Sequence, residues 1–113
     1  RMEKQFDVLS RQDTHILLSA VDKEMLAGSV MGVVCGELYG DCRPFLVLEN
    51  MIVDSAYRHK GVGRALLQAL EERAKARSCT QIILVTEAER EDACAFYEAC
   101  GFQLNNRGFK KKL

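Results

Sequence analysis

Apolar residues in the first half of the chain gather in runs that favour β-strands. The run HILLSAVD at 15–22 predicts one strand, and a polar turn at 22–24 separates it from a second β-rich run, MLAGSVMGVVCGELY at 25–39. A turn at 40–44 precedes FLVLENMIVD at 45–54. This third run is apolar on both faces, as expected of a central strand that helices cover on both sides.

Glycine recurs at every fourth position of the second run, as Gly28, Gly32 and Gly36. Glycine weakens a strand, and it often marks a bulge or a place where another part of the backbone comes close. We therefore expect irregular pairing or a close backbone contact along this strand.

The second half of the chain changes to a helical period. Apolar residues form one face of a helix that is expected to end near Ser78, and charged residues lie mostly on the other face. The apolar face consists of Val62, Leu66, Ala69, Leu70 and Ala74. TQIILVT at 80–86 predicts a short strand, so strand, loop, helix and strand form a βαβ unit with a right-handed crossover and parallel strands.

A second helix is expected after this strand. Acids at Glu89, Glu91 and Asp92 favour a helix N-terminus, and Gly101 should end the helix. Its apolar face consists of Ala93, Phe96, Tyr97 and Cys100. The tail QLNNRGFKKKL at 103–113 can form two short strands around its central turn.

Length and pattern together predict a single α/β (α+β) domain over residues 1–113. A chain of 113 residues has the size of one small domain with one core. At its start, Met2, Phe6 and Leu9 have the spacing of the last turns of a helix.

Charge and cysteine usage narrow the functional classes. Sixteen Lys and Arg balance sixteen Asp and Glu, so anion binding must come from local clustering, and a nucleic-acid binder would usually be more basic. No apolar run is long enough for a membrane helix, and the first residues do not form a signal peptide, so we expect a cytoplasmic protein. The five cysteines include no C-x-x-C pair, which argues against a metal site and favours small buried hydrophobes in a reducing compartment.

The loop between the third run and the long helix is the strongest chemical signal. Gly61 and Gly63 let backbone N–H groups turn toward one point, to which the helix N-terminus adds positive potential. Arg58, Lys60 and Arg64 can add charge-assisted hydrogen bonds to a diphosphate. The spacing fits neither the P-loop of NTPases nor the dinucleotide fingerprint. Taken alone, the glycines are equally compatible with a simple tight turn.

Three segments in order resemble the acetyl-CoA-binding core of the GNAT superfamily of N-acetyltransferases. They are LENMIVD at 48–54, the loop 58–63 with the motif [Arg/Gln]-x-x-Gly-x-[Gly/Ala], and AFYEACGF at 95–102. The resemblance covers residues 16–113. It implies the GNAT fold, a mixed central sheet flanked by helices with a splayed pair of parallel strands. Family members usually begin with a further strand and one or two helices before the position of His15, and we expect that part to be missing here.

The resemblance also implies a set of cofactor contacts. The loop backbone should wrap the CoA pyrophosphate, and a bulged central strand should pair with the pantetheine arm. The residues so assigned are Met51, Ile52, Val53, Arg58, His59, Lys60, Gly61, Val62, Gly63, Arg64, Arg90 and Phe96. Lys60 and Arg64 either reach the CoA 3′-phosphate or form a solvated rim, and Phe96 belongs to the core or to the cofactor wall. Many family members have Asn where Arg90 stands.

Two residues are the candidates for acid–base chemistry. Tyr97 stands where the family keeps a tyrosine beside the thioester sulfur, although its place on the apolar helix face equally suits a core residue. Glu49 interrupts an apolar run, so it should face a cleft or a partner and serve as a base, or else point to solvent at a strand bulge. The Met51 N–H can bind the oxyanion, while strand alternation directs Asn50 to the opposite face unless the bulge resets the register.

The implied activity is transfer of the acetyl group of acetyl-CoA to a primary amine of a small molecule or peptide, by direct attack in a ternary complex. An acid at Glu49 mildly favours a small cationic amine. One alternative is a catalytically inactive CoA-binding regulatory module, and a weaker one is a domain that binds another anion. The expected partners are acetyl-CoA and an amine acceptor, with no nucleic acid and no membrane. A homodimer through the C-terminal strands is a further option.

Overall fold

The computed structural model describes residues 14–36, 43–86, 91–104 and 109–113. The expected N-terminal helical turns, most of the turn at 40–44, and the residues Cys42, Glu89 and Arg90 lie outside these ranges.

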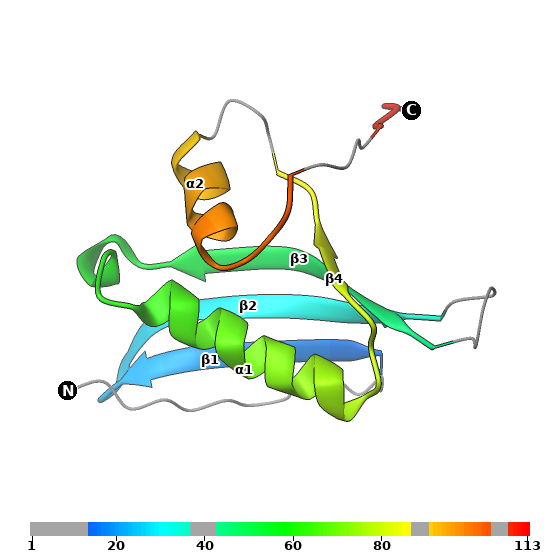
Figure 1. Cartoon of the computed structure of the whole chain (residues 1–113). Coiled ribbons are helices and arrows are strands. Elements are labelled where there is room, and N and C mark those ends of the chain that lie inside the picture. The colour runs from blue at the N-terminus through cyan, green and yellow to red at the C-terminus, as the bar shows by residue number, and fades with distance from the viewer. Residues whose placement is uncertain (1–13, 37–42, 87–90, 105–108) are drawn as a thin grey trace.

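Four strands form one mixed sheet in the order β1-β2-β3-β4 (Figure 1). They are β1 (His15–Asp22), β2 (Met25–Cys35), β3 (Phe45–Val53) and β4 (Ile82–Leu84). β1 and β3 pair antiparallel with β2, whereas β4 pairs parallel with β3. The expected hairpins and the parallel βαβ unit are therefore confirmed, with β4 shorter than the run at 80–86 predicted.

A bulge interrupts β3 near its middle. Met31 of β2 pairs with Asn50 and the next residue, Gly32, pairs with Leu48, so Glu49 is the extra residue of β3. An extra residue bends a strand and increases its local twist. The irregularity that the glycines of β2 predicted is present, and it lies opposite Gly32 in the ladder.

β3 and β4 separate at the bulge. β4 pairs only with Leu46, Val47 and Leu48, whereas β3 continues to Val53. In the described part of the chain, the edge of β3 from Asn50 onward therefore has no strand beside it. This is the splayed parallel pair that the resemblance implied.

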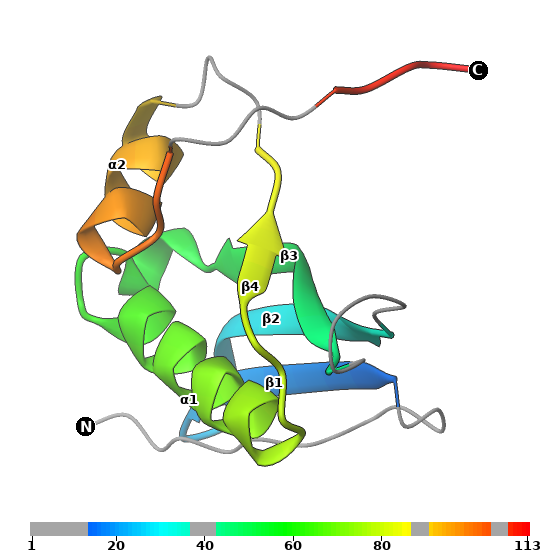
Figure 2. The same ribbon diagram turned by 45° about the vertical axis from the view of Figure 1, so that its right-hand side comes forward.

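Two α-helices lie on one face of the sheet (Figure 2). α1 (Val62–Ala76) contacts β1, β2 and β3, and α2 (Glu91–Ala99) packs near the start of α1. The buried core lies between the sheet and α1, and consists of Ile16, Leu18, Ala20, Ala27, Val30, Leu46, Leu48, Val62, Leu66, Leu67, Leu70 and Ala74. The predicted apolar face of α1 is confirmed, with Ala69 partly buried against the core and Leu67 buried in addition.

Gly28 explains how α1 comes so close to β2. A Cβ atom placed on Gly28 would lie 2.8 Å from the carbonyl oxygen of Ile52 and 3.2 Å from side-chain atoms of both Val62 and Leu66. Only a residue without a side chain fits between this helix and this pair of strands. The close backbone approach expected from the glycine spacing is thus confirmed at Gly28.

The expectation that helices cover β3 on both faces is wrong for the described residues. Leu46 and Leu48 are buried beneath the helices, but Phe45 and Val47, which alternate with them along the strand, are only partly buried, and Ile52 is 64% exposed. An apolar run specifies that a strand is largely shielded, but it does not distinguish a covered face from a partly open one.

Two other expectations need correction. Residues 103, 104 and 109–113 of the tail form no strand, and the remainder of the tail lies outside the described residues. The four described cysteines, Cys35, Cys79, Cys94 and Cys100, are free thiols as expected but partly rather than fully buried.

Candidate functional site

The chain leaves β3 through a tightly hydrogen-bonded turn. The carboxylate of Asp54 accepts a hydrogen bond of 2.9 Å from the N–H of Ala56, and this caps the short 3₁₀ helix η1 (Ser55–Tyr57). The N–H of Tyr57 donates to the Asp54 carbonyl at 2.8 Å. Short polar side chains favour such turns because they replace backbone partners. The turn fixes where the glycine loop begins.

The loop itself contains two left-handed residues. His59 has φ 63° and Gly61 has φ 82°. Gly61 directly precedes α1 as its N-cap residue, and within the described part of the chain this helix start has no side-chain cap. Uncapped N–H groups at a helix start are ready donors for an anion, and the helix dipole favours negative charge there. Apart from its chain neighbours, no described residue lies within 4 Å of the position that a Cβ atom on Gly61 would occupy, so this side of the loop is open within the described structure.

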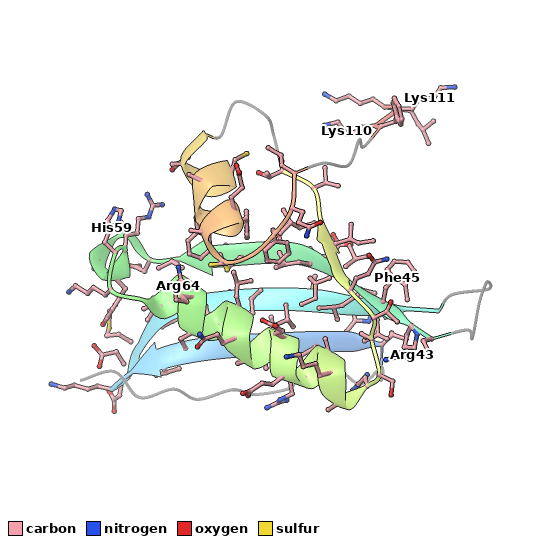
Figure 3. The ribbon with its side chains drawn as sticks, viewed as in Figure 1. Arg43, Phe45, His59, Arg64, Lys110 and Lys111 are labelled. Carbon is pink, nitrogen blue, oxygen red and sulfur yellow. The ribbon has the colours of Figure 1, made fainter. Side chains whose placement is uncertain are left out.

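The charges around the helix start are suited to a phosphate group. Arg58, His59, Lys60 and Arg64 are all exposed, and the first turn of α1 contains no acid. Figure 3 shows His59 and Arg64 at the end of the molecule where α1 begins, far from Arg43 and Phe45 at the opposite end. Val62, by contrast, is only 1% exposed and belongs to the buried core.

Three elements meet at Gly63 in the first turn of α1. A Cβ atom on Gly63 would lie 3.0 Å from Cζ of Phe96 in α2 and 3.6 Å from Cε of Met51 in β3. The structure therefore brings together three residues that the sequence assigned separately to the cofactor site. Phe96 and Met51 also pack against the main core, and the assignment of Phe96 to the cofactor wall stays a prediction.

Tyr97 lies within an aromatic cluster. Its ring makes edge-on contacts with Phe96 at 5.4 Å and with Phe102 at 5.6 Å between ring centroids. Gly101, with φ 97°, ends α2 as expected, and the Phe102 N–H bonds back to the Tyr97 carbonyl at 3.0 Å. This turn folds Phe102 onto Tyr97. The tyrosine is partly buried and held in place, which suits a group that must present its hydroxyl in one direction.

Glu49 is exposed in the structure, and so is its neighbour Asn50. Of the two alternatives for Glu49, its exposure agrees with an acid at a strand bulge, because Glu49 is the extra residue of the bulge in β3. Its use as a base stays a prediction. Arg90 lies outside the described residues.

The sequence analysis missed a contact that joins the glycine loop to the far edge of the sheet. The hydroxyl of Tyr57 donates a 3.0 Å hydrogen bond to Oδ2 of Asp22 at the end of β1, and the Lys60 ammonium lies 5.9 Å from the centre of the Tyr57 ring. The hydrogen bond to Asp22, with burial and the charges of Asp22 and Asp54, raises the pKa of Tyr57 above its ordinary value. The pairing partners are 35 residues apart, so no local pattern indicated it.

The model of the acetyltransferase (GNAT) family matches residues 1–102. The chain belongs to this family. In the described part of this GNAT chain no helix is both long and apolar enough to cross a membrane, and no three His, Cys, Asp or Glu residues gather as metal ligands would.

Similar proteins include acetyltransferases of small molecules by name. An L-methionine sulfoximine/L-methionine sulfone acetyltransferase of Pseudomonas aeruginosa is 32% identical over 107 residues, which cover 90% of this chain and 58% of the relative. A glucosamine 6-phosphate N-acetyltransferase of Trypanosoma brucei brucei is 33% identical over 66 residues, or 58% of this chain and 43% of the relative.

Solved structures share the fold. A putative acetyltransferase from Agrobacterium tumefaciens superimposes with a TM-score of 0.84 at 26% identity, and the match covers 90% of this chain and 71% of the other. The chain spans about half the length of the curated relatives it matches.

Proposed function

We propose that this chain is an acyl-CoA-dependent N-acetyltransferase that moves the acetyl group of acetyl-CoA to a primary amine. The observation that carries the proposal is the gap between β3 and β4. Among the described residues, β3 from Asn50 to Val53 pairs with β2 but not with β4, and the chain then passes through η1 into the glycine loop at the start of α1. A strand edge that ends at an anion site matches a long, extended, phosphorylated thioester.

The residues present fit this co-substrate at both ends. In a strand, alternate N–H and C=O groups point to opposite sides, so Met51, Ile52 and Val53 direct part of their backbone polar groups away from β2. These groups are free to pair with the amides of a pantetheine arm as a further strand would. The uncapped start of α1 and the exposed Arg58 and Arg64 would hold the pyrophosphate.

The proposed chemistry is a direct attack in a ternary complex. The neutral amine forms a C–N bond to the thioester carbonyl, and the C–S bond breaks as the tetrahedral intermediate collapses. Glu49 takes the proton of the amine, directly or through water, and the Tyr97 hydroxyl gives a proton to the departing thiolate. The Met51 N–H stabilises the oxyanion.

The proposed acceptor is a small amine. The two relatives named above are acetyltransferases of an amino-acid analogue and of an amino sugar phosphate by their names. Glu49 is an exposed carboxylate beside the gap between the strands. We propose that it favours a cationic amine over an acidic one, because opposite charges attract and like charges repel across a site.

Calorimetric titration with acetyl-CoA tests the cofactor site without knowledge of the acceptor. Gly61→Glu places a longer, negatively charged side chain at a left-handed position, and it should weaken binding by about tenfold or more. Gly61→Asn is the matched control, because Asn tolerates that conformation and adds no charge, so binding should persist. A Gly61→Glu variant that is folded and binds as tightly as the wild type would contradict the proposal.

An amine panel then tests turnover. Wild-type protein should acetylate at least one amine, and Tyr97→Phe and Glu49→Gln should each lower kcat while acetyl-CoA binding persists. Each change removes one proton-transfer group and keeps nearly the same size. Binding of acetyl-CoA without turnover of any amine would instead support an inactive CoA-binding module.

A further inference from the structure

We infer that Tyr57 and Asp22 form a clamp that positions the glycine loop for the CoA pyrophosphate. This inference rests on the proposed function, since it assigns positioning residues to the same site. Neither residue touches the reacting atoms in this assignment. They act through the loop backbone.

The loop has one firm anchor on each side. On its downstream side, the buried side chain of Val62 fixes the first residue of α1 in the core. On its upstream side, the ring of Tyr57 packs against the same core and its hydroxyl bonds to Asp22. The exposed segment 58–61 between them has two residues in the left-handed region. A short strained segment keeps its shape only when the structure around it holds both ends.

Asp22 is a rigid support for this contact. It is the last residue of β1 and pairs with Met25 across the tight turn 23–24, so its backbone belongs to a hairpin. Among the described residues, its second oxygen, Oδ1, is buried and has no hydrogen-bond partner. The Tyr57 hydroxyl therefore supplies a donor to a carboxylate that is short of donors, and hydrogen bonds to a charged acceptor are stronger than neutral ones.

The chemistry of Asp22 makes the clamp distinguishable from simple electrostatics. A carboxylate near an anion site repels the anion, so by charge alone the loss of Asp22 would strengthen binding. If Asp22 acts as a clamp, its loss weakens binding instead, because the loop is no longer held. The two roles predict opposite signs for the same substitution.

The Tyr57 ring has a second contact that the test must preserve. The Lys60 ammonium lies 5.9 Å from the ring centre, within the range of a cation–π contact. Tyr57→Phe keeps the ring and removes only the hydroxyl, so it isolates the hydrogen bond. Asp22→Ala removes the acceptor, whereas Asp22→Asn keeps an acceptor oxygen and removes the charge.

The experiment measures the dissociation constant of acetyl-CoA for these variants by calorimetry. Tyr57→Phe and Asp22→Ala should each weaken binding about 5- to 10-fold, as expected for one hydrogen bond to a charged group, and the double variant should be no weaker than either. Asp22→Asn should stay within about twofold of the wild type. Where an acceptor amine is known, KM for acetyl-CoA should rise while kcat is unchanged.

A matched control separates positioning from loss of stability. Ala74→Gly, at the far end of α1, should lower the free energy of unfolding about as much as Tyr57→Phe does, because glycine weakens a helix. It should leave acetyl-CoA binding unchanged. The clamp is refuted if Tyr57→Phe binds like the wild type, or if Asp22→Ala binds more tightly than the wild type.

Hydrogen exchange keeps this inference separate from the proposed function. In the absence of any cofactor, the amides of 58–61 should exchange faster in Tyr57→Phe than in Ala74→Gly. A wild-type protein that binds no acetyl-CoA would overturn the proposed function. Unchanged exchange in Tyr57→Phe would overturn the clamp, whatever the binding result.

Discussion

Gly61 and Gly63 stand two residues apart in one loop motif, yet the structure needs them for different reasons. Gly61 is left-handed, with φ 82°, and has open space where a Cβ atom would be. Gly63 is an ordinary helical residue, and a Cβ atom there would press on Phe96 of α2. Glycine is required at position 61 because of the local backbone conformation. It is required at position 63 because two segments that are distant in sequence pack closely there.

This difference shows that a glycine motif is not a single property. Gly61 serves the conformation of the loop that would face a phosphate. Gly63 allows two helices to meet, and in doing so it brings Phe96 and Met51 to the same place. A substitution at each site should therefore be relieved by a different second substitution.

The largest effect is expected at Gly28, where the crowding seen at Gly63 becomes extreme. Gly28→Ala would press on the carbonyl oxygen of Ile52, a backbone atom that cannot rotate away, and should lower the free energy of unfolding by about 1–3 kcal/mol or more. Gly36→Ala is the control, since none of the described residues beyond its chain neighbours lies within 4 Å of its Cβ position. Urea denaturation measures both. Equal stability of the two variants would show that crowding is not the reason for these glycines.

Gly61→Ala isolates the conformational demand. Alanine fits the space but not the left-handed backbone, so the free energy of unfolding should fall by about 1–2 kcal/mol. Gly61→Asn should lose less, because Asn adopts this conformation more readily. Urea denaturation of both variants tests this order. If Phe96→Leu restored the stability of Gly61→Ala, the distinction between the two glycines would be wrong, because Phe96→Leu removes crowding and not backbone strain.

Gly63→Ala with Phe96→Leu isolates the packing demand. In the wild-type background, Ala improves the helix by about 0.5–1 kcal/mol but presses on the end of the Phe96 ring, so the net change should be small. In the Phe96→Leu background, Gly63→Ala should raise the free energy of unfolding by this full amount, because the ring no longer opposes the added methyl group. A double-mutant cycle of unfolding free energies should give a coupling of about 0.5–1 kcal/mol. Strict additivity would mean that the two residues do not press on one another.

The smallest effect is a pH dependence on the Gly61 side of the site. The Tyr57 pKa is raised in the folded protein, chiefly by its hydrogen bond to Asp22, so folding favours the protonated phenol. This contribution is complete below the unfolded pKa of about 10 and is lost as pH rises through the folded pKa. The stability difference between wild type and Tyr57→Phe should therefore shrink above about pH 10. A difference that grows with pH would contradict the assignment, and the Gly63–Phe96 coupling should not change with pH.

Local patterns were sufficient for most of the fold. The bounds of β1 and the start of α1 at Val62 follow from short-range alternation and from the glycine that precedes the helix. The prediction of strands in the tail was wrong for its described residues. A run that is able to form a strand still needs a partner in the sheet, and residues 109–113 have none in the described structure.

The residues of the candidate site could be proposed from the sequence, but their arrangement could not. The loop motif indicated an unusual backbone at Gly61 because the requirement for a left-handed residue is local. The contact of Tyr57 with Asp22 depends on how β1 and η1 come together in the fold, and the exposure of Glu49 depends on a bulge whose register only the partner strand defines. Sequence spacing carries no direct signal for either.

The early end of β4 also affects the protein when no co-substrate is bound. An unpaired strand edge can template the addition of another extended chain, which is how sheets associate into aggregates. In the part of the chain that the structure describes, β3 carries such an edge beyond Leu48, and Ile52 on this segment is exposed. The bulge and the exposed carboxylate of Glu49 interrupt this edge, as bulges and charges do in other strands that resist association. The residue proposed as the base would then also protect the empty sheet from self-association.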